Sequence, residues 1–120
     1  MRNNEIRYFF GFALADSMFA GDVIIERKEV TPEAVRAMAE TGVLNPCINP
    51  SHAATIAAMR DRFGIDIPIP EAPPKVELRV GDTLIVMGVR GLPRLTDRHE
   101  YTEEEVASAT FSFAEYRVVE

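Results

Sequence analysis

Two segments of this chain are apolar at nearly every position, and they restrict the possible folds more than any other feature. Residues 8–13 read Tyr-Phe-Phe-Gly-Phe-Ala, and residues 83–89 read Thr-Leu-Ile-Val-Met-Gly-Val. Successive side chains of a strand point to opposite faces of the sheet, so a strand that is apolar at consecutive positions is buried on both faces. We therefore predict that residues 5–13 and 83–89 are central strands of a sheet that is covered on both sides.

Three helices are indicated by the residues at their starts. Thr31 precedes a proline and a glutamate, Asn49 precedes a proline and a serine, and Thr102 begins a capping box that ends at Glu105. Glycines at positions 42 and 64 are predicted to end the first two helices. Helices are therefore expected over residues 31–41, 51–62 and 102–109.

Further strands are predicted over residues 22–27, which carry Val23, Ile24 and Ile25, and over 75–80 and 110–119, where apolar and polar residues alternate. Residues 43–48 are a candidate for one more short strand. Gly81-Asp82 predicts a tight hairpin, and a change of inward parity near Ala114 predicts a bulge in the last strand. We expect a single α/β domain over residues 1–120, with a mixed sheet of about five strands and helices on both faces.

The charge balance and the single cysteine exclude several classes of function. Thirteen basic and 19 acidic residues give a net charge of −6, which disfavours binding of long nucleic acid. No apolar run approaches the roughly 20 residues of a membrane span, so we expect no membrane partner. Cys47 cannot form an internal disulfide, which favours a cytoplasmic location. Ala13-Leu14-Ala15 resembles a signal-peptidase site, but Glu5 and the short apolar stretch favour a buried strand instead.

His52 is the first candidate for chemistry. It lies at the start of the second predicted helix and shares one helix face with Ile56, Met59 and Phe63. Free N–H groups at a helix start attract anions, so His52 is either a residue that exchanges a proton with a bound phosphate or a half-buried structural histidine. No second pair of ligands accompanies Cys47 and His52, so neither a metal nor another cofactor is expected.

Two further positions are candidates for phosphate contacts. Residues 90–99 hold three arginines, among them Arg90 and Arg94, and form either a phosphate clamp or a solvated loop. Ser17 follows the first central strand, and ligands of α/β folds gather where such strands end. Its hydroxyl group is either a donor to a phosphate or a helix cap.

Four short motifs, in order along the chain, resemble one known family. They are Phe-Ala-Leu-Ala-Asp-Ser-Met-Phe at residues 12–19, Ser-His-Ala-Ala-Thr at 51–55, Val-Gly-Asp-Thr-Leu-Ile-Val at 80–86, and Leu-Pro at 92–93 followed by Tyr-Thr-Glu-Glu-Glu at 101–105. Their order and spacing cover nearly the whole chain. The chain thus resembles the viral anti-CRISPR ring nucleases of type III systems and their bacterial relatives.

The resemblance implies a symmetric dimer that encloses cyclic tetra-adenylate, the second messenger with which type III CRISPR effectors switch on ancillary nucleases. In that family a ribose 2′-hydroxyl attacks the adjacent phosphate without a metal, and a histidine at a helix start protonates the leaving 5′-oxygen. The products are linear di-adenylates that end in a 2′,3′-cyclic phosphate. The resemblance implies that His52 is this general acid.

The residues around His52 depart from the family pattern. Ser51 stands where the family has glycine, and Ala54 where it has a small polar residue. The loop arginine of the family falls on Gly91, one position after Arg90. We expect Ser17, Ser51, Arg90 and Arg94 to contact the ligand. The alternatives are a non-catalytic sponge that sequesters a cyclic nucleotide and a protein that uses the fold only for protein contacts.

Overall fold

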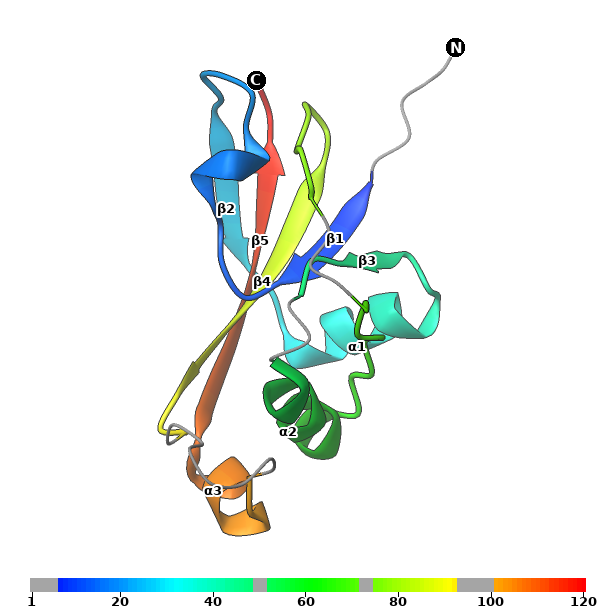
Figure 1. Cartoon of the computed structure of the whole chain (residues 1–120), viewed down its shortest axis with the longest axis vertical. Helices are drawn as coiled ribbons and strands as arrows, with labels where there is room; N and C mark the ends of the chain where they lie inside the picture. Colours follow the sequence, from blue (N-terminus) through cyan, green and yellow to red (C-terminus); the bar gives the residue numbers. More distant parts are fainter. Residues whose placement is uncertain (1–6, 49–51, 72–74, 93–100) are drawn as a thin grey trace.

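The computed structural model describes residues 7–48, 52–71, 75–92 and 101–120. The elements follow in the order β1 (Tyr8–Gly11), the 3-10 helix η1 (Asp16–Met18), β2 (Ile25–Glu29), α1 (Pro32–Glu40), β3 (Leu44–Pro46), α2 (Ala53–Phe63), β4 (Thr83–Arg90), α3 (Glu103–Ser108) and β5 (Thr110–Val118) (Figure 1).

The two strands with continuous apolar sequences, β1 and β4, lie in the interior of the sheet, as predicted. The strand order is β2-β5-β4-β1-β3. β1 is parallel to β3 and β4, whereas β5 is antiparallel to β4 and β2. The short candidate strand within residues 43–48 is β3, at the edge of the sheet. The prediction of an α/β fold with a mixed five-stranded sheet is therefore confirmed.

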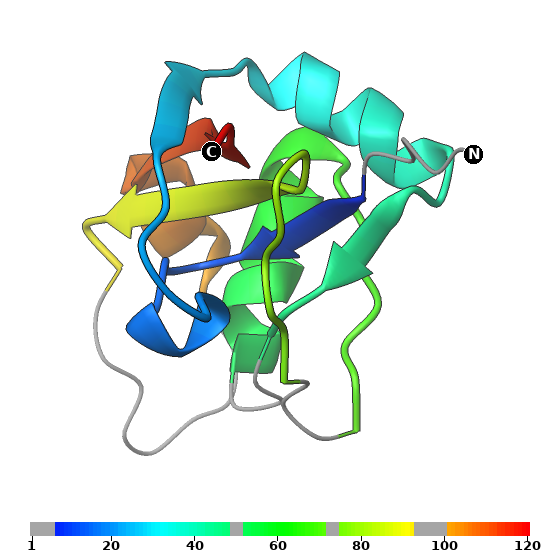
Figure 2. The same cartoon turned by 90° about the horizontal axis from the view of Figure 1, so that it is seen from above.

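One face of the sheet is covered by α-helices. Val35 of α1 and the pair Ile56 and Met59 of α2 pack with Phe10 and Ile85 of the central strands, and all five side chains are buried. Their burial explains why α1 and α2 carry apolar stripes at helical spacing. Figure 2 shows α1 on one side of the strands and η1 on the other.

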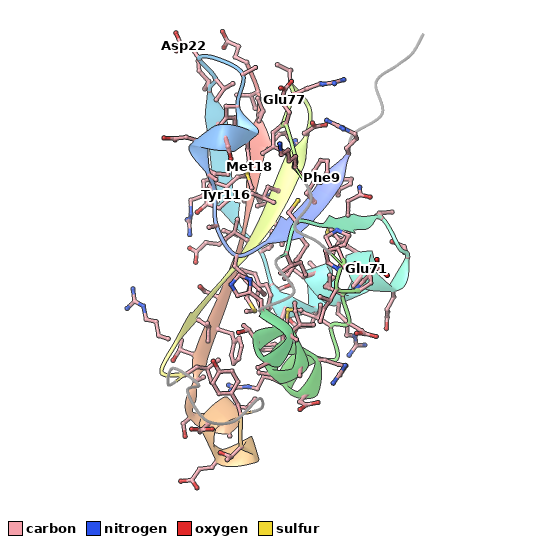
Figure 3. The ribbon with its side chains drawn as sticks, viewed as in Figure 1. Phe9, Met18, Asp22, Glu71, Glu77 and Tyr116 are labelled. Carbon is pink, nitrogen blue, oxygen red and sulfur yellow. The ribbon has the colours of Figure 1, made fainter. Side chains whose placement is uncertain are left out.

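The other face is covered by η1 and by the chain around Leu78. Met18 of η1 and Leu78 pack with Phe9 and Leu84, and Figure 3 shows Met18 and Phe9 on this side. The backbone N–H of Leu78 donates to the carbonyl of Met18 at 2.6 Å, which ties these two covering segments together. Helical structure thus covers both faces, but on this side it is a single 3-10 turn.

The predicted strand over residues 75–80 is wrong. None of these residues belongs to a strand, and Val80 is 67% exposed although the alternation predicted it to face inward. The physical reason is that β4 already pairs with β1 on one edge and β5 on the other, so no edge is free for a hairpin partner. Gly81-Asp82 instead forms part of a turn in which Asp82 N donates to the carbonyl of Arg79.

The predicted bulge near Ala114 is also wrong. Pairing between β4 and β5 is continuous from Arg90 with Thr110 to Thr83 with Arg117, and Ala114 lies opposite Val86. The inward-facing positions of β5 appeared to change from odd to even residue numbers because β5 carries buried side chains on both faces. Phe113 belongs to the core under the helices and Val118 to the opposite core, so their odd spacing needs no inserted residue.

The paired strands β4 and β5 extend beyond the rest of the sheet. Gly11 at the end of β1 pairs with Val86, and β4 continues from there to Arg90. The resulting two-stranded arm carries α3 at its end (Figure 1). Phe63 at the end of α2 holds the arm through edge-to-face contacts with Phe111 and Phe113, whose ring centroids lie 5.3 and 5.5 Å away.

The helix ends follow the signals in the sequence. Thr31 Oγ1 accepts a hydrogen bond from Ala34 N at 3.1 Å, and Thr102 and Glu105 form the predicted capping box. Gly64 ends α2 with a φ of 73°, a conformation that favours glycine.

Candidate functional site

The chain leaves β1 and β3 toward opposite faces of the sheet. The connection after β1 leads to η1 on one face, whereas β3 is followed by α2 on the other. In open α/β sheets, ligands bind outside the carboxyl ends of neighbouring parallel strands at such a switch point. The structure therefore points to the ends of β1 and β3 as the place for a site.

The backbone segments that follow β1 and β3 pack closely against each other at this switch point. Cys47 N donates to the carbonyl of Phe10 at 2.7 Å, directly beside Gly11. A Cβ atom on Gly11 would lie 3.3 Å from the carbonyl oxygen of Cys47, closer than ordinary van der Waals contact. Glycine at this position therefore lets the segment after β3 approach the end of β1.

His52 lies at the switch point as the N-cap residue of α2. Its side chain is exposed and makes no capping hydrogen bond. Its ring stands edge-to-face against Phe12, the residue after β1, with 5.0 Å between the ring centroids. The expected apolar face of α2 is present, since Ile56 and Met59 are buried, but His52 is exposed to solvent rather than half-buried. A ligand outside the strand ends could therefore reach the imidazole.

Phe12 contacts the ring of His52, a role for which its position in the sequence gave no separate signal. Its ring also contacts Phe10 edge-to-face, at 5.9 Å, and packs against the core under the helices. A buried core residue thus supports Phe12, and Phe12 in turn limits the positions of the His52 ring. The signal available in the sequence was only that Phe12 continues the apolar run of β1.

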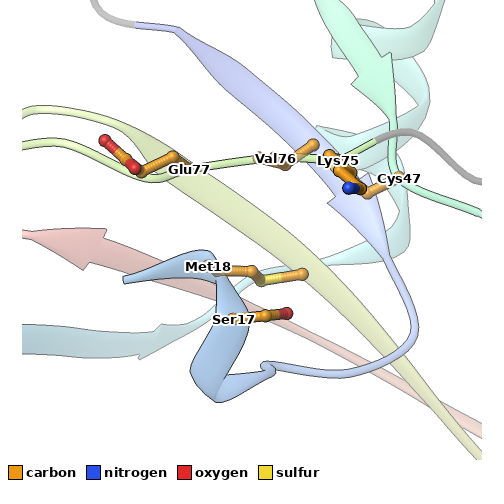
Figure 4. A pocket seen from close by; sticks show the side chains of 6 residues that line it. All are labelled: Ser17, Met18, Cys47, Lys75, Val76 and Glu77. Atoms are coloured by element: carbon orange, nitrogen blue, oxygen red, sulfur yellow. The ribbon is translucent and has the colours of Figure 1, made fainter. Parts of the chain in front are cut away.

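Ser17 lines a pocket of about 520 Å³ on the opposite face of the sheet. The residues that line the pocket come from η1, from the segment after β3 and from the chain before β4: Ser17, Met18, Cys47, Lys75, Val76 and Glu77. Figure 4 shows Ser17 and Met18 on one side, with Lys75 and Cys47 across from them. Ser17 is not a cap, because the N-cap position of η1 is Ala15.

Lys75 and Cys47 give this pocket its chemistry. Lys75 adds a cation that the sequence analysis did not select, and it is one of the two lysines of the chain. Burial raises the pKa of the Cys47 thiol to about 11, so the thiol is protonated at neutral pH and is a poor nucleophile. The pocket thus offers a hydroxyl group, an ammonium group and the carboxylate of Glu77 beside the apolar surfaces of Met18 and Val76.

The predicted site residues are not gathered at one point of the subunit. The ring that contacts His52 packs on the core under the helices, whereas Met18 and Cys47 beside Ser17 pack on the opposite core. Arg90 is exposed at the tip of β4, about 13 Å beyond the level of Gly11 at about 3.3 Å per residue. Ser51 and Arg94 lie outside the described residues.

The described residues hold neither a metal-binding cluster nor a helix that could span a membrane. Over residues 7–48, 52–71, 75–92 and 101–120, no group of three or more His, Cys, Asp or Glu side chains could hold a metal ion. In the same part of the chain, no helix is long and apolar enough to span a membrane.

Comparison with known proteins supports the fold. No model of a protein family matches the chain, and no curated protein sequence matches it. Among solved structures, the chain is similar to B116 of Sulfolobus turreted icosahedral virus, with a TM-score of 0.67 and 18% sequence identity. The match covers 92% of this chain and 98% of the viral protein. At this identity the likeness concerns the fold alone, and the chain therefore shares its fold with a viral protein.

Proposed function

We propose that this chain is a metal-independent ring nuclease that cleaves cyclic tetra-adenylate, or a related cyclic oligonucleotide, into linear products ending in a 2′,3′-cyclic phosphate. The observation that carries the proposal is the place of His52, which is exposed at the start of α2 beside the switch point and matches the histidine of the ring nuclease family. The similarity in fold to a viral protein supports the viral part of this proposal. Such an activity in the cytoplasm would counter type III CRISPR signalling.

In the proposed reaction the substrate supplies its own nucleophile. A ribose 2′-oxygen forms a bond to the adjacent phosphorus, the bond from phosphorus to the 5′-oxygen breaks, and the proton of the 2′-hydroxyl passes to solvent. The imidazolium of His52 gives its proton to the leaving 5′-oxygen, as a general acid. The remaining task of the protein is to hold the ring so that attack occurs in line.

Phosphate contacts are the proposed role of the remaining polar residues. Ser17 and Lys75 face one pocket and would donate hydrogen bonds to a phosphate there, while the apolar sides of that pocket suit a base. Arg90 at the arm would bind a further phosphate. For Ser51 and Arg94 the ligand contact remains a proposal from the sequence.

We also propose that the active form is a homodimer. In one subunit the pocket of Ser17, the ring of His52 and the tip of β4 lie on different sides of the strand ends. A two-fold axis would place two copies of each group around a ligand that itself has two-fold symmetry. The arm that carries Arg90 past the end of β1 would then reach toward the partner subunit.

The direct test is incubation of the purified protein with cyclic tri-, tetra- and hexa-adenylate in the presence of EDTA, with products separated by chromatography. We expect one ring to be opened, and the His52→Ala variant to open it roughly 10²–10⁴-fold more slowly while still binding it. Thr31→Ala is the matched control, because it also changes an N-cap residue but on α1, where it removes a real capping bond. That variant should lose about 0.5–2 kcal/mol of stability and keep the rate.

The possible results separate the candidate functions. If every ring survives but one binds tightly, the protein is a sponge for a cyclic nucleotide. If no ring changes the melting temperature, the fold serves protein contacts. Cleavage that is lost in EDTA, or that persists in His52→Ala, would refute the proposed mechanism.

A further inference from the structure

Arg62, in the last turn of α2, connects α2 to the far end of the arm. Its Nη1 donates to three backbone carbonyls at the end of α3: Val106 at 2.8 Å, Ala107 at 3.2 Å and Ala109 at 3.1 Å. Its guanidinium also lies over the rings of Phe63 and Phe111, 5.6 and 5.7 Å from their centroids. One side chain therefore contacts α2, α3 and β5.

The carbonyls of Ala107 and Ala109 come after the last hydrogen bond at the end of α3, whereas that of Val106 also accepts from Ala109 N at 3.3 Å. The last carbonyls of any helix must bond to side chains, water or a following turn. α3 has only six residues, and a helix this short has little stability of its own. Val106 and Ala109 are its buried apolar contacts in the described structure. The position of α3 therefore depends strongly on Arg62.

The chain leaves β4 directly against the corner that Arg62 holds. Arg90 is the last residue of β4 and pairs with Thr110, and Gly91 follows with a φ of 91°. A Cβ atom at Gly91 would lie 3.5 Å from Cα of Ala109, whose carbonyl accepts a hydrogen bond from Arg62. Ala109 precedes Thr110, which pairs with Arg90, so the corner that Arg62 bonds adjoins the strand pair that ends at Arg90.

We propose that Arg62 is a positioning residue for Arg90. It fixes the corner between α3 and β5, and this corner sets the direction of the chain where Arg90 leaves the sheet. The assignment of Arg90 to a phosphate of the ligand rests on the proposed function, whereas the role of Arg62 at the corner does not. All three hydrogen bonds come from Nη1, so the ammonium group of a lysine could replace part of them, but it lacks the planar group that lies over two rings.

Hydrogen–deuterium exchange measured by mass spectrometry tests the corner without any ligand. In Arg62→Ala, the amides of residues 106–110 should exchange roughly 10- to 100-fold faster, as expected for the loss of hydrogen bonds to a charged group. Exchange in residues 88–91 should also rise, and Arg62→Lys should restore only part of the protection of residues 106–110. Arg60→Ala is the matched control, because Arg60 is an exposed arginine in the same turn of α2, and it should leave exchange unchanged.

A second measurement tests the link to Arg90. Titration of cyclic tetra-adenylate should give roughly tenfold weaker binding in Arg62→Ala, whereas the rate of ring opening at saturation stays within about twofold of the wild type. Unchanged exchange in residues 106–110 would overturn the proposal, as would unchanged affinity despite faster exchange. A wild type that neither binds nor cuts the ring, with the exchange result intact, would refute the proposed function and the ligand role of Arg90, but not the corner.

Discussion

An ion pair between the half-exposed Arg7 and the buried Asp82 joins the start of β1 to the start of β4, and its removal should destabilise the protein measurably. Arg7 Nε donates to Asp82 Oδ1 at 3.0 Å, and Arg7 Nη2 donates to the other carboxylate oxygen. Asp82 also accepts from the backbone N–H of Arg79 at 2.8 Å. The hydrogen bond that Arg7 donates to Asp82 raises the pKa of Arg7 above its already high ordinary value.

The expected magnitude follows from how the two groups are exposed. Removing one partner of a buried pair costs about 3–5 kcal/mol, but the Arg7 side chain is 43% exposed and water would solvate it once Asp82 is gone. We therefore expect Asp82→Ala to cost about 2–3 kcal/mol. Arg7→Ala should cost more, about 3–4 kcal/mol, because it leaves a carboxylate that is only 5% exposed with the Arg79 N–H as its remaining donor.

The assay is urea denaturation of the wild type, both single variants and the double variant, followed by circular dichroism. If the pair is coupled, the double variant should be about as unstable as Arg7→Ala, which gives a coupling energy of about 2–3 kcal/mol at an unchanged m-value. Arg27→Ala is a control on the exposed edge strand β2 and should change stability by less than about 1 kcal/mol. Additive single effects, with coupling below about 0.5 kcal/mol, would refute this account of the pair.

Four other predictions concern the Cys47 thiol, the ring of Phe12 and the proposed dimer. The Cys47 thiol, with its pKa raised to about 11 by burial, should react with iodoacetamide at pH 8 much more slowly than free cysteine, and a normal rate would contradict its burial. Because only the unfolded thiol releases its proton above its ordinary pKa of 9.0, urea midpoints should fall as pH rises from about 9 through 11, and Cys47→Ala should remove this part of the fall. Phe12→Leu should cost about 0.5–1.5 kcal/mol beyond the lost apolar area, through its contacts with Phe10 and His52, as seen by urea denaturation, and should slow ring opening; an unchanged rate would show that Phe12 does not orient His52. Light scattering at micromolar concentration should give twice the 13.4 kDa of one chain, and a monomer with and without cyclic tetra-adenylate would refute the dimer.

The features that the sequence predicts correctly are those set by near neighbours. The caps at Thr31 and Thr102 act within one helical turn, and Gly64 ends α2 because glycine adopts a positive φ at little cost. The interior positions of β1 and β4 also follow from sequence, since apolar side chains at consecutive positions cannot all be buried at an exposed edge. The helix that begins beside His52 also follows from its local start signals, although α2 begins at Ala53 and not at residue 51 as predicted.

The wrong predictions are those that depend on which strands are neighbours in the sheet. Alternation of apolar and polar residues within one segment carries no information about its neighbours. Residues 75–80 alternate like a strand, yet they form none, because β1 and β5 already occupy both edges of β4. The candidate site depends on the same property. Phe12 meets His52, and Lys75 faces the pocket of Ser17, only because the sheet order brings together segments that lie 40 or more residues apart. Side-chain type and local spacing are properties of the sequence alone, whereas contact between distant segments is decided by how the whole chain buries its two apolar cores.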